Sequence, residues 1–208
     1  MANEQHSIAT YVSDMLALER HIRIPFDTQQ KDDDFNEYSD SAQLVTRLSA
    51  LSNTHIDQLK QCLSNLGGHE MSPIKSAVVE VEGAVAGAID KMRKTKVSKA
   101  LRDDYTALAL CSAGYTALVA TANGLGDMTV SGLAQRLLGD YAQMIMEIGE
   151  ALPAVVVQEL RATGLDIDTA TSETSRSQVS QAWRSGARDV ASTSTTRGSV
   201  ETAPQSSF

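Results

Sequence analysis

A histidine and a glutamate interrupt two otherwise apolar helical stripes of the sequence. His55 takes the slot between Leu51 and Leu59, in a segment whose apolar residues recur at steps of three and four. Glu19 occupies the equivalent slot of an earlier segment, after Met15. An ionisable group on an inward stripe needs a partner, because a lone charge is costly to bury. The two residues are therefore candidates for metal ligands, or for a buried pair in which imidazole and carboxylate satisfy each other.

Two aspartates extend this set to four helical segments. Asp104 lies on the apolar stripe of the fourth segment, and Asp140 lies on that of the fifth. Helical bundles build carboxylate-bridged di-iron sites from such groups on several inward stripes. The candidate metal ligands are therefore Glu19, His55, Asp104 and Asp140, and the metal they would hold is iron or another divalent cation.

Long helices must position these residues. The apolar periodicity predicts four of them, at residues 7–26, 41–66 and 98–123, and from Thr129 or Ser131 to about residue 161. A shorter helix, opened by Pro73, precedes the third long one. Four long helices, with a short one in the crossover between the second and the third, predict an all-α four-helix bundle.

Local signals predict where these helices begin and end. Ser7 is the expected N-cap of the first helix, and Pro25 is its expected stop. The pair Gly67 and Gly68 is typical of the left-handed cap that ends a helix. We expect the last long helix to continue past Pro153 with at most a kink.

The composition divides the chain into two parts. Residues 1–163 carry the bundle pattern, whereas residues 164–208 are rich in Ser and Thr and poor in apolar residues. Such a composition predicts a flexible, disordered tail. The tail also holds Trp183, in a stretch where Val179, Ala187 and Val190 recur at helical steps. The alternative is therefore a docking helix around Trp183 that binds a protein partner.

The bulk properties exclude several classes of partner. A formal net charge of −8 argues against broad nucleic-acid binding, which depends on concentrated Lys and Arg. Cys62 and Cys111 fall within apolar helical patterns, as buried free thiols do. No stretch approaches the ~20 apolar residues of a membrane span, and the first residues lack the pattern of a secretory signal. We expect a cytoplasmic protein that binds neither nucleic acid nor membrane.

The successive helical segments resemble those of the YciE/YciF-like branch of the ferritin-like superfamily. The resemblance covers roughly residues 7–160, in the same helix order, and includes the short crossover helix. It is carried by helix lengths, Leu-Gly helix ends and one glutamate, in the segments "MLALERHI", "HIDQLKQCLSNLGG", "AVVEVEGAVAGAI", "SAGYTALVATANGLGD" and "LAQRLLGDYAQMIMEIGEAL". It implies a ferritin-like helical bundle, a dimer, an association with bacterial stress responses and, in some members, a di-metal centre.

The family pattern of metal ligands is only partly present. Glu19 matches the glutamate of the first helix, and His55 matches the histidine of the Glu-x-x-His pair on the second. Ser52 stands where that pair has its glutamate. On the fourth helix the family carboxylate falls on Leu108 or Cys111, and on the fifth Asp140 and Gln143 replace Glu and His. The resemblance therefore implies a degenerate di-iron site.

We accordingly expect a ferritin-like, stress-associated bundle that has no cofactor and acts by self-association, as a homodimer, or by binding another protein. This hypothesis favours a non-catalytic protein. The alternative from the enzyme class is a di-iron carboxylate oxidase or an iron-handling protein. A third hypothesis is a granule-coating or shell-targeted protein that docks through the tail around Trp183.

Overall fold

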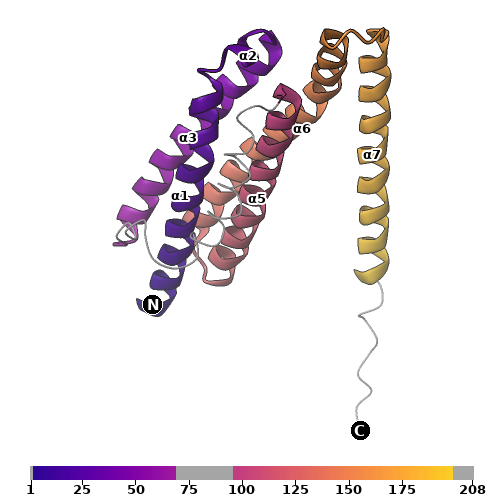
Figure 1. The fold of residues 1–208 in the computed structure, drawn as a ribbon. Helices are drawn as coiled ribbons and strands as arrows, with labels where there is room; N and C mark the ends of the chain where they lie inside the picture. The colour runs from indigo at the N-terminus through magenta and orange to yellow at the C-terminus, as the bar shows by residue number, and fades with distance from the viewer. Residues whose placement is uncertain (1, 69–95, 199–208) are drawn as a thin grey trace.

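The computed structural model describes residues 2–68 and 96–198, all of whose regular elements are helices (Figure 1). These helices are α1 (Ala2–Gln29), α2 (Asp33–Asn36), α3 (Ser39–Asn65), α5 (Val97–Gly124), α6 (Met128–Ala162) and α7 (Ala170–Gly198). The predicted all-α class is confirmed. The short helix expected after Pro73 lies outside the described residues.

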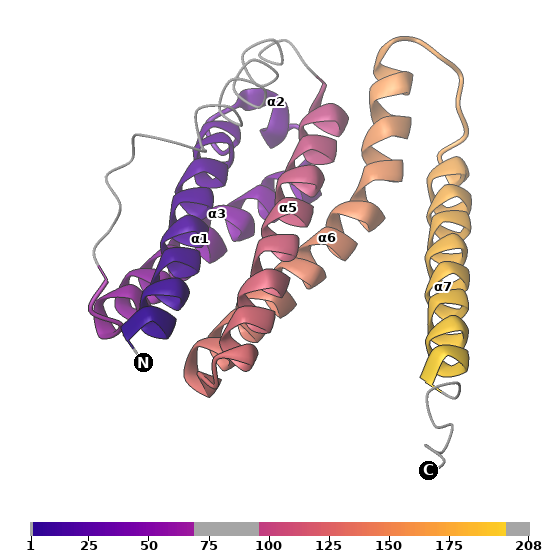
Figure 2. The ribbon, with the colours of Figure 1, turned by 90° about the horizontal axis from the view of Figure 1, so that it is seen from below.

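Four of these helices form the bundle that positions the inward residues. α1 packs against α3 and α5, and α6 packs against α5 and α3, so each of the four helices has two neighbours within the bundle (Figures 1 and 2). α6 also contacts α7. Gln29 at the end of α1 bonds Asp104 near the start of α5, which makes these two helices antiparallel. Because α1 and α3 form a hairpin, α3 and α5 run in the same direction. The chain between them therefore joins opposite ends of the bundle, which is the predicted crossover.

The predicted C-terminal ends of α3 and α5 are confirmed. α3 ends before Gly67, which has a φ of 66°, and α5 ends before Gly126, which has a φ of 76°. Both values lie in the left-handed region, where glycine is favoured because it lacks a Cβ. α6 begins at Met128, one residue before the earlier of the two expected starts. Its N-cap is Asp127, whose carboxylate accepts hydrogen bonds from the first free backbone N–H groups.

Both predicted ends of the first helix are wrong. α1 begins at Ala2 rather than at Ser7, because the residues between them include good helix formers and no helix breaker. It also continues through Pro25 to Gln29. The last turn is held by the complete burial of Phe26 and by the hydrogen bond of Gln29 to α5, which offset the cost of a proline inside a helix.

The core lies along the axis shared by α1, α3, α5 and α6, and it is built mainly from Leu, Val and Ile. α6 continues past Pro153 as predicted. Among the described helices, α5 is the one long and apolar enough by composition to span a membrane, and its inward side packs in the bundle core.

The tail contains a helix where the composition predicts a flexible segment. α7 runs antiparallel to the C-terminal half of α6 and stands apart from the rest of the bundle (Figures 1 and 2). Within it, Glu173 pairs with Arg176 one turn later, at 3.4 Å. A helix therefore forms around Trp183, as the alternative prediction had it. It is longer than the stretch from Val179 to Val190 in which the apolar residues recur at helical spacing.

Candidate functional site

The Glu19 carboxylate is the centre of a buried polar cluster to which all four bundle helices contribute. It is completely buried in the middle of α1. Its Oε2 accepts hydrogen bonds from the Tyr141 hydroxyl of α6, at 2.5 Å, and from the Ser52 hydroxyl of α3, at 3.1 Å. Its Oε1 accepts from the Tyr115 hydroxyl of α5 and lies 3.1 Å from Nδ1 of His55 on α3. A carboxylate offers about four acceptor positions; three hydroxyls occupy three of them, and Nδ1 of His55 occupies the fourth when it carries the ring proton.

His55 connects this buried carboxylate to the surface. Its Nε2 lies 3.3 Å from Oδ2 of Asp140, whose side chain is 49% exposed. Both carboxylates can accept from the ring at once only when each ring nitrogen carries a proton. The rings of Tyr141 and Tyr115 pack against the imidazole, with centroids 4.6 and 6.0 Å away. His55 is thus fixed in position on every side, and the prediction that it faces Glu19 inside the core is confirmed.

Burial keeps the hydroxyls of this cluster protonated. Burial, together with the charge of Glu19, raises the pKa of Tyr115 and of Tyr141 far above the ordinary tyrosine value. The same two causes raise the pKa of the neighbouring Cys111 thiol. These groups therefore donate to Glu19 or remain neutral beside it at physiological pH. None of them is an activated nucleophile, because nucleophilic attack requires the deprotonated form.

Asp104 forms a separate polar site near one end of the bundle. It lies eleven residues before Tyr115 on α5, about 16 Å along the helix axis. Its Oδ1 accepts a 2.9 Å hydrogen bond from Nε2 of Gln29. The other oxygens, Oδ2 of Asp104 and Oε1 of Gln29, are buried without a partner. Burial raises the pKa of Asp104 to about 7, although the hydrogen bond from Gln29 lowers it; the nearby charge of Asp103 adds a smaller increase.

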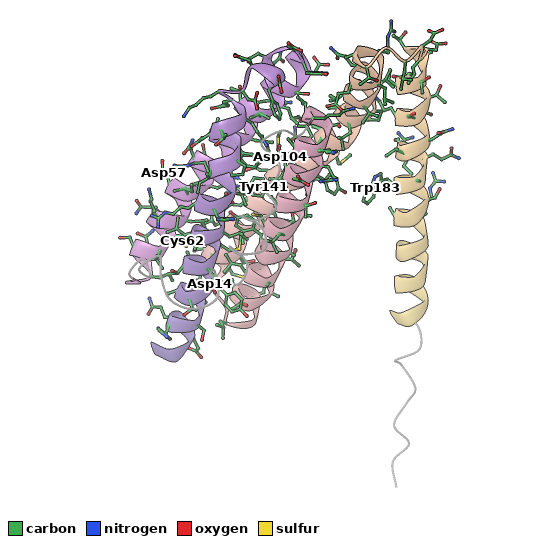
Figure 3. The ribbon with its side chains drawn as sticks, viewed as in Figure 1. Asp14, Asp57, Cys62, Asp104, Tyr141 and Trp183 are labelled. Carbon is green, nitrogen blue, oxygen red and sulfur yellow. The ribbon has the colours of Figure 1, made fainter. Side chains whose placement is uncertain are left out.

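The structure brings three of the four candidate ligands together, in an arrangement that does not suit a metal ion. Glu19, His55 and Asp140 form a row. Asp104 lies at another depth, above the level of Tyr141 in the view of Figure 3. The two ring nitrogens of His55 point in opposite directions, so the two carboxylates flank the ring and cannot bind one ion with it. Di-iron centres use about four carboxylates and two histidines. Within residues 2–68 and 96–198, no three His, Cys, Asp or Glu residues are placed to hold a metal ion.

Several members of the site were not predicted from the sequence. Ser52 was recognised only as a missing glutamate, yet it is fully buried and donates to Glu19. The sequence pattern likewise gives no partner for the hydroxyls of Tyr115 and Tyr141. A usable signal exists for Ser52, because it lies three residues before His55 on the same helical face.

A buried glutamate near the C-terminal end of α6 was also missed. Glu159 accepts hydrogen bonds from the backbone N–H of Ser98, at 2.9 Å, and from its hydroxyl, at 2.6 Å. Ser98 lies in the first turn of α5, where backbone N–H groups lack partners within the helix. Glu159 therefore caps the N-terminus of α5 from a neighbouring helix.

Comparison with known proteins supports the fold and goes no further. No protein-family model and no curated protein matches this sequence. The chain is similar in structure to the protein XCC3681 from Xanthomonas campestris pv. campestris, with a TM-score of 0.65 at 18% sequence identity. The match covers 78% of this chain and 99% of the Xanthomonas chain. At this identity the similarity concerns the arrangement of helices alone.

Proposed function

We propose that this chain is a non-catalytic ferritin-like bundle of the YciE/YciF-like branch, which acts in the cytoplasm, in a stress response, by associating with a second copy of itself. In this proposal, the hydrogen-bond cluster around Glu19 occupies the position at which the family has its metal centre, and its role is structural. The helix order, with its crossover between α3 and α5, is that of ferritin-like bundles. The free Cys62 and Cys111 suit a reducing compartment.

The observation that carries the proposal is the saturation of Glu19. Its carboxylate already accepts from Tyr115, Tyr141 and Ser52 and pairs with His55. A bridging metal would need the lone pairs that these donors occupy. Binding would therefore break several buried hydrogen bonds to a charged group, each worth about 1.5–3 kcal/mol. The cluster favours the metal-free state and holds four helices together.

Metal analysis combined with one variant tests this proposal. Protein purified from cells grown with iron should hold far less than one metal ion per chain. Glu19→Ala should lower the free energy of unfolding by at least about 3 kcal/mol, because it leaves a buried histidine and two buried hydroxyls without their acceptor. The loss should be the same with and without added iron. Unfolding by urea, followed by far-UV circular dichroism, measures it.

Glu37→Ala is the matched control, since Glu37 is exposed at the end of α2. We expect it to change stability by less than about 0.5 kcal/mol. Two irons per chain, with oxygen consumption by the reduced protein, would instead establish the di-iron alternative. The structural role of Glu19 would also be refuted by a Glu19→Ala variant that is destabilised only when iron is supplied.

A further inference from the structure

Two helices of the bundle expose an apolar face on the side away from α1 and α3. Leu110 of α5 is 48% exposed, and Met146 of α6 is 68% exposed. The other exposed positions along the middle of α5 carry no charge; they are Thr106, Ala109, Ala113, Thr116, Ala117 and Ala120. We call this surface, formed by Leu110, Met146 and these α5 residues, the outer face. A continuous uncharged surface of this kind marks an interaction site more often than chance exposure does.

α7 presents a second apolar surface. Val179 and Trp183 lie one turn apart, and their side chains are 42% and 65% exposed. In the view of Figure 3, Trp183 extends from the side of α7 that faces the bundle. An isolated helix rich in Ser and Thr has little stability of its own in water. α7 therefore needs a surface to pack on, and its own bundle leaves Trp183 mostly uncovered.

An open groove remains between α6 and α7. Glu150 of α6 lines an open groove together with Arg176, Arg184 and Arg188 of α7, and the groove has a volume of about 590 Å³. Met146 lies one turn before Glu150, on the same face of α6. Yet Met146 and Trp183 both stay about two-thirds exposed. Within one chain, the outer face and the apolar side of α7 are thus both left open.

α7 and the rest of the chain also carry opposite net charge. Residues 170–198 contain four Arg, one Glu and one Asp, whereas residues 1–169 contain 14 basic and 23 acidic residues. The net charges are therefore +2 for α7 and −9 for the rest of the chain up to it. In the described part of the chain, Arg184 has no ion-pair partner. An acidic bundle attracts a basic helix, whether that helix belongs to the same chain or to another copy.

We propose that the outer face binds α7 of a second copy of this chain, so that two copies exchange their α7 helices around a two-fold axis. Such an isologous contact uses each surface once in each copy and leaves neither open. A 29-residue helix is about 44 Å long. A contact strip about 10 Å wide along it would bury about 440 Å² on each partner, or about 880 Å² in all. Two such contacts bury about 1,760 Å², which lies within the range of a standard interface. This inference names the surface for the self-association proposed above and depends on that proposal.

A mixing experiment with two variants tests the exchange. Met146→Glu damages the outer face and leaves α7 intact, whereas Trp183→Glu damages α7 and leaves the outer face intact. Both side chains are mostly exposed, so folding should be preserved, and circular dichroism and the thermal midpoint check this. Light scattering should show the unchanged chain at about twice its 22.3 kDa mass. Each variant alone should dissociate at a concentration at least about tenfold higher.

Mixing the two variants should restore association. In a mixed pair, α7 of the Met146→Glu chain packs on the outer face of the Trp183→Glu chain, and this contact is free of substitutions. The mixture should therefore form dimers at concentrations where either variant alone is monomeric. Ile24→Glu is the control, because Ile24 is 59% exposed on α1, outside both surfaces, and this variant should dimerise normally.

The other outcomes separate the two proposals. If both variants dimerise like the unchanged chain, the interface lies elsewhere, and self-association itself stands. If the variants dissociate and mixing restores nothing, the exchange is refuted, since α7 then packs on its own bundle or on the other α7. If the unchanged chain is monomeric at all concentrations, self-association is refuted together with the exchange. Trp183 is the only tryptophan, so a red shift of fluorescence on dilution gives a second readout of the same contact.

Discussion

The Asp104→Asn substitution should make the protein more stable at pH 8 and leave its stability near pH 4 almost unchanged. Asp104 is 2% exposed, and one of its oxygens has no hydrogen-bond partner. Burial raises its pKa to about 7 in the folded protein, against about 3.9 in an unfolded chain. The folded protein therefore holds a proton between these two pH values that the unfolded chain has lost.

The sign and the magnitude follow from proton linkage. Because the folded state binds more protons, the free energy of unfolding falls as the pH rises from about 4 to about 7, and this contribution is constant above that. The slope is about 1.4 kcal/mol per pH unit, and the total is about 4 kcal/mol. An asparagine does not ionise, and its amide can donate to the partnerless Oε1 of Gln29 while its oxygen accepts from Nε2. Asp104→Asn should thus gain up to about 4 kcal/mol at pH 8.

Urea unfolding between pH 4.5 and 8.5, followed by far-UV circular dichroism, measures this difference. Other carboxylates also titrate in acid, so the quantity of interest is the stability of the variant minus that of the unchanged protein at each pH. Asp57→Asn is the control, because the side chain of Asp57 is 79% exposed on α3, and its difference should not vary with pH. A difference for Asp104→Asn that is flat, or that favours the unchanged protein at pH 8, would refute a buried, protonated Asp104.

Two further predictions concern groups whose partners were absent from the sequence pattern. Glu159→Gln should lower the free energy of unfolding by about 1–2 kcal/mol, because the N-terminus of α5 loses a charged cap at Ser98. Glu150→Gln on the same helix is the control and should have little effect. Equal losses in the two variants would refute the capping role. Burial, followed by the charge of Asp127, raises the pKa of Cys62 to about 11, and Cys111 is fully buried with a raised pKa. An alkylating reagent at pH 8 should therefore modify Cys62 slowly and Cys111 only in urea, as measured by mass spectrometry. Rapid labelling of Cys111 without urea would contradict the packed core.

The sequence predicts the inward direction of the polar residues better than it predicts their partners. Helical period placed Glu19, His55, Asp104 and Asp140 on inward stripes. The first three are buried, whereas the side chain of Asp140 is 49% exposed, so its inward placement is wrong. The period does not state how far one helix is shifted along its neighbour. Asp104 therefore looked equivalent to the others, although it lies about 16 Å from the cluster along α5 and bonds Gln29.

The same limit explains the errors at the ends of the first helix. Glycine fixes a helix end locally, since a positive φ at Gly67 or Gly126 is unfavourable for other residues. Proline only adds a local cost, and packing elsewhere can exceed it. Phe26 and Gln29 find partners on other helices, so α1 passes Pro25. The glycines at the helix ends were therefore reliable signals. The proline was not, because tertiary contacts can overrule it.

The chemistry of the cluster separates a metal site from a structural one. A metal ion needs several acceptor atoms that converge on one point and have lone pairs to spare. Around Glu19 the converging groups are the hydroxyls of Ser52, Tyr115 and Tyr141, which point protons inward. Ser52 thus contributes a donor beside Glu19, at a position where a metal site would need an acceptor. One carboxylate among donors is stable without a metal, whereas two carboxylates side by side are not, so the donors around Glu19 suit a buried site that holds no metal ion.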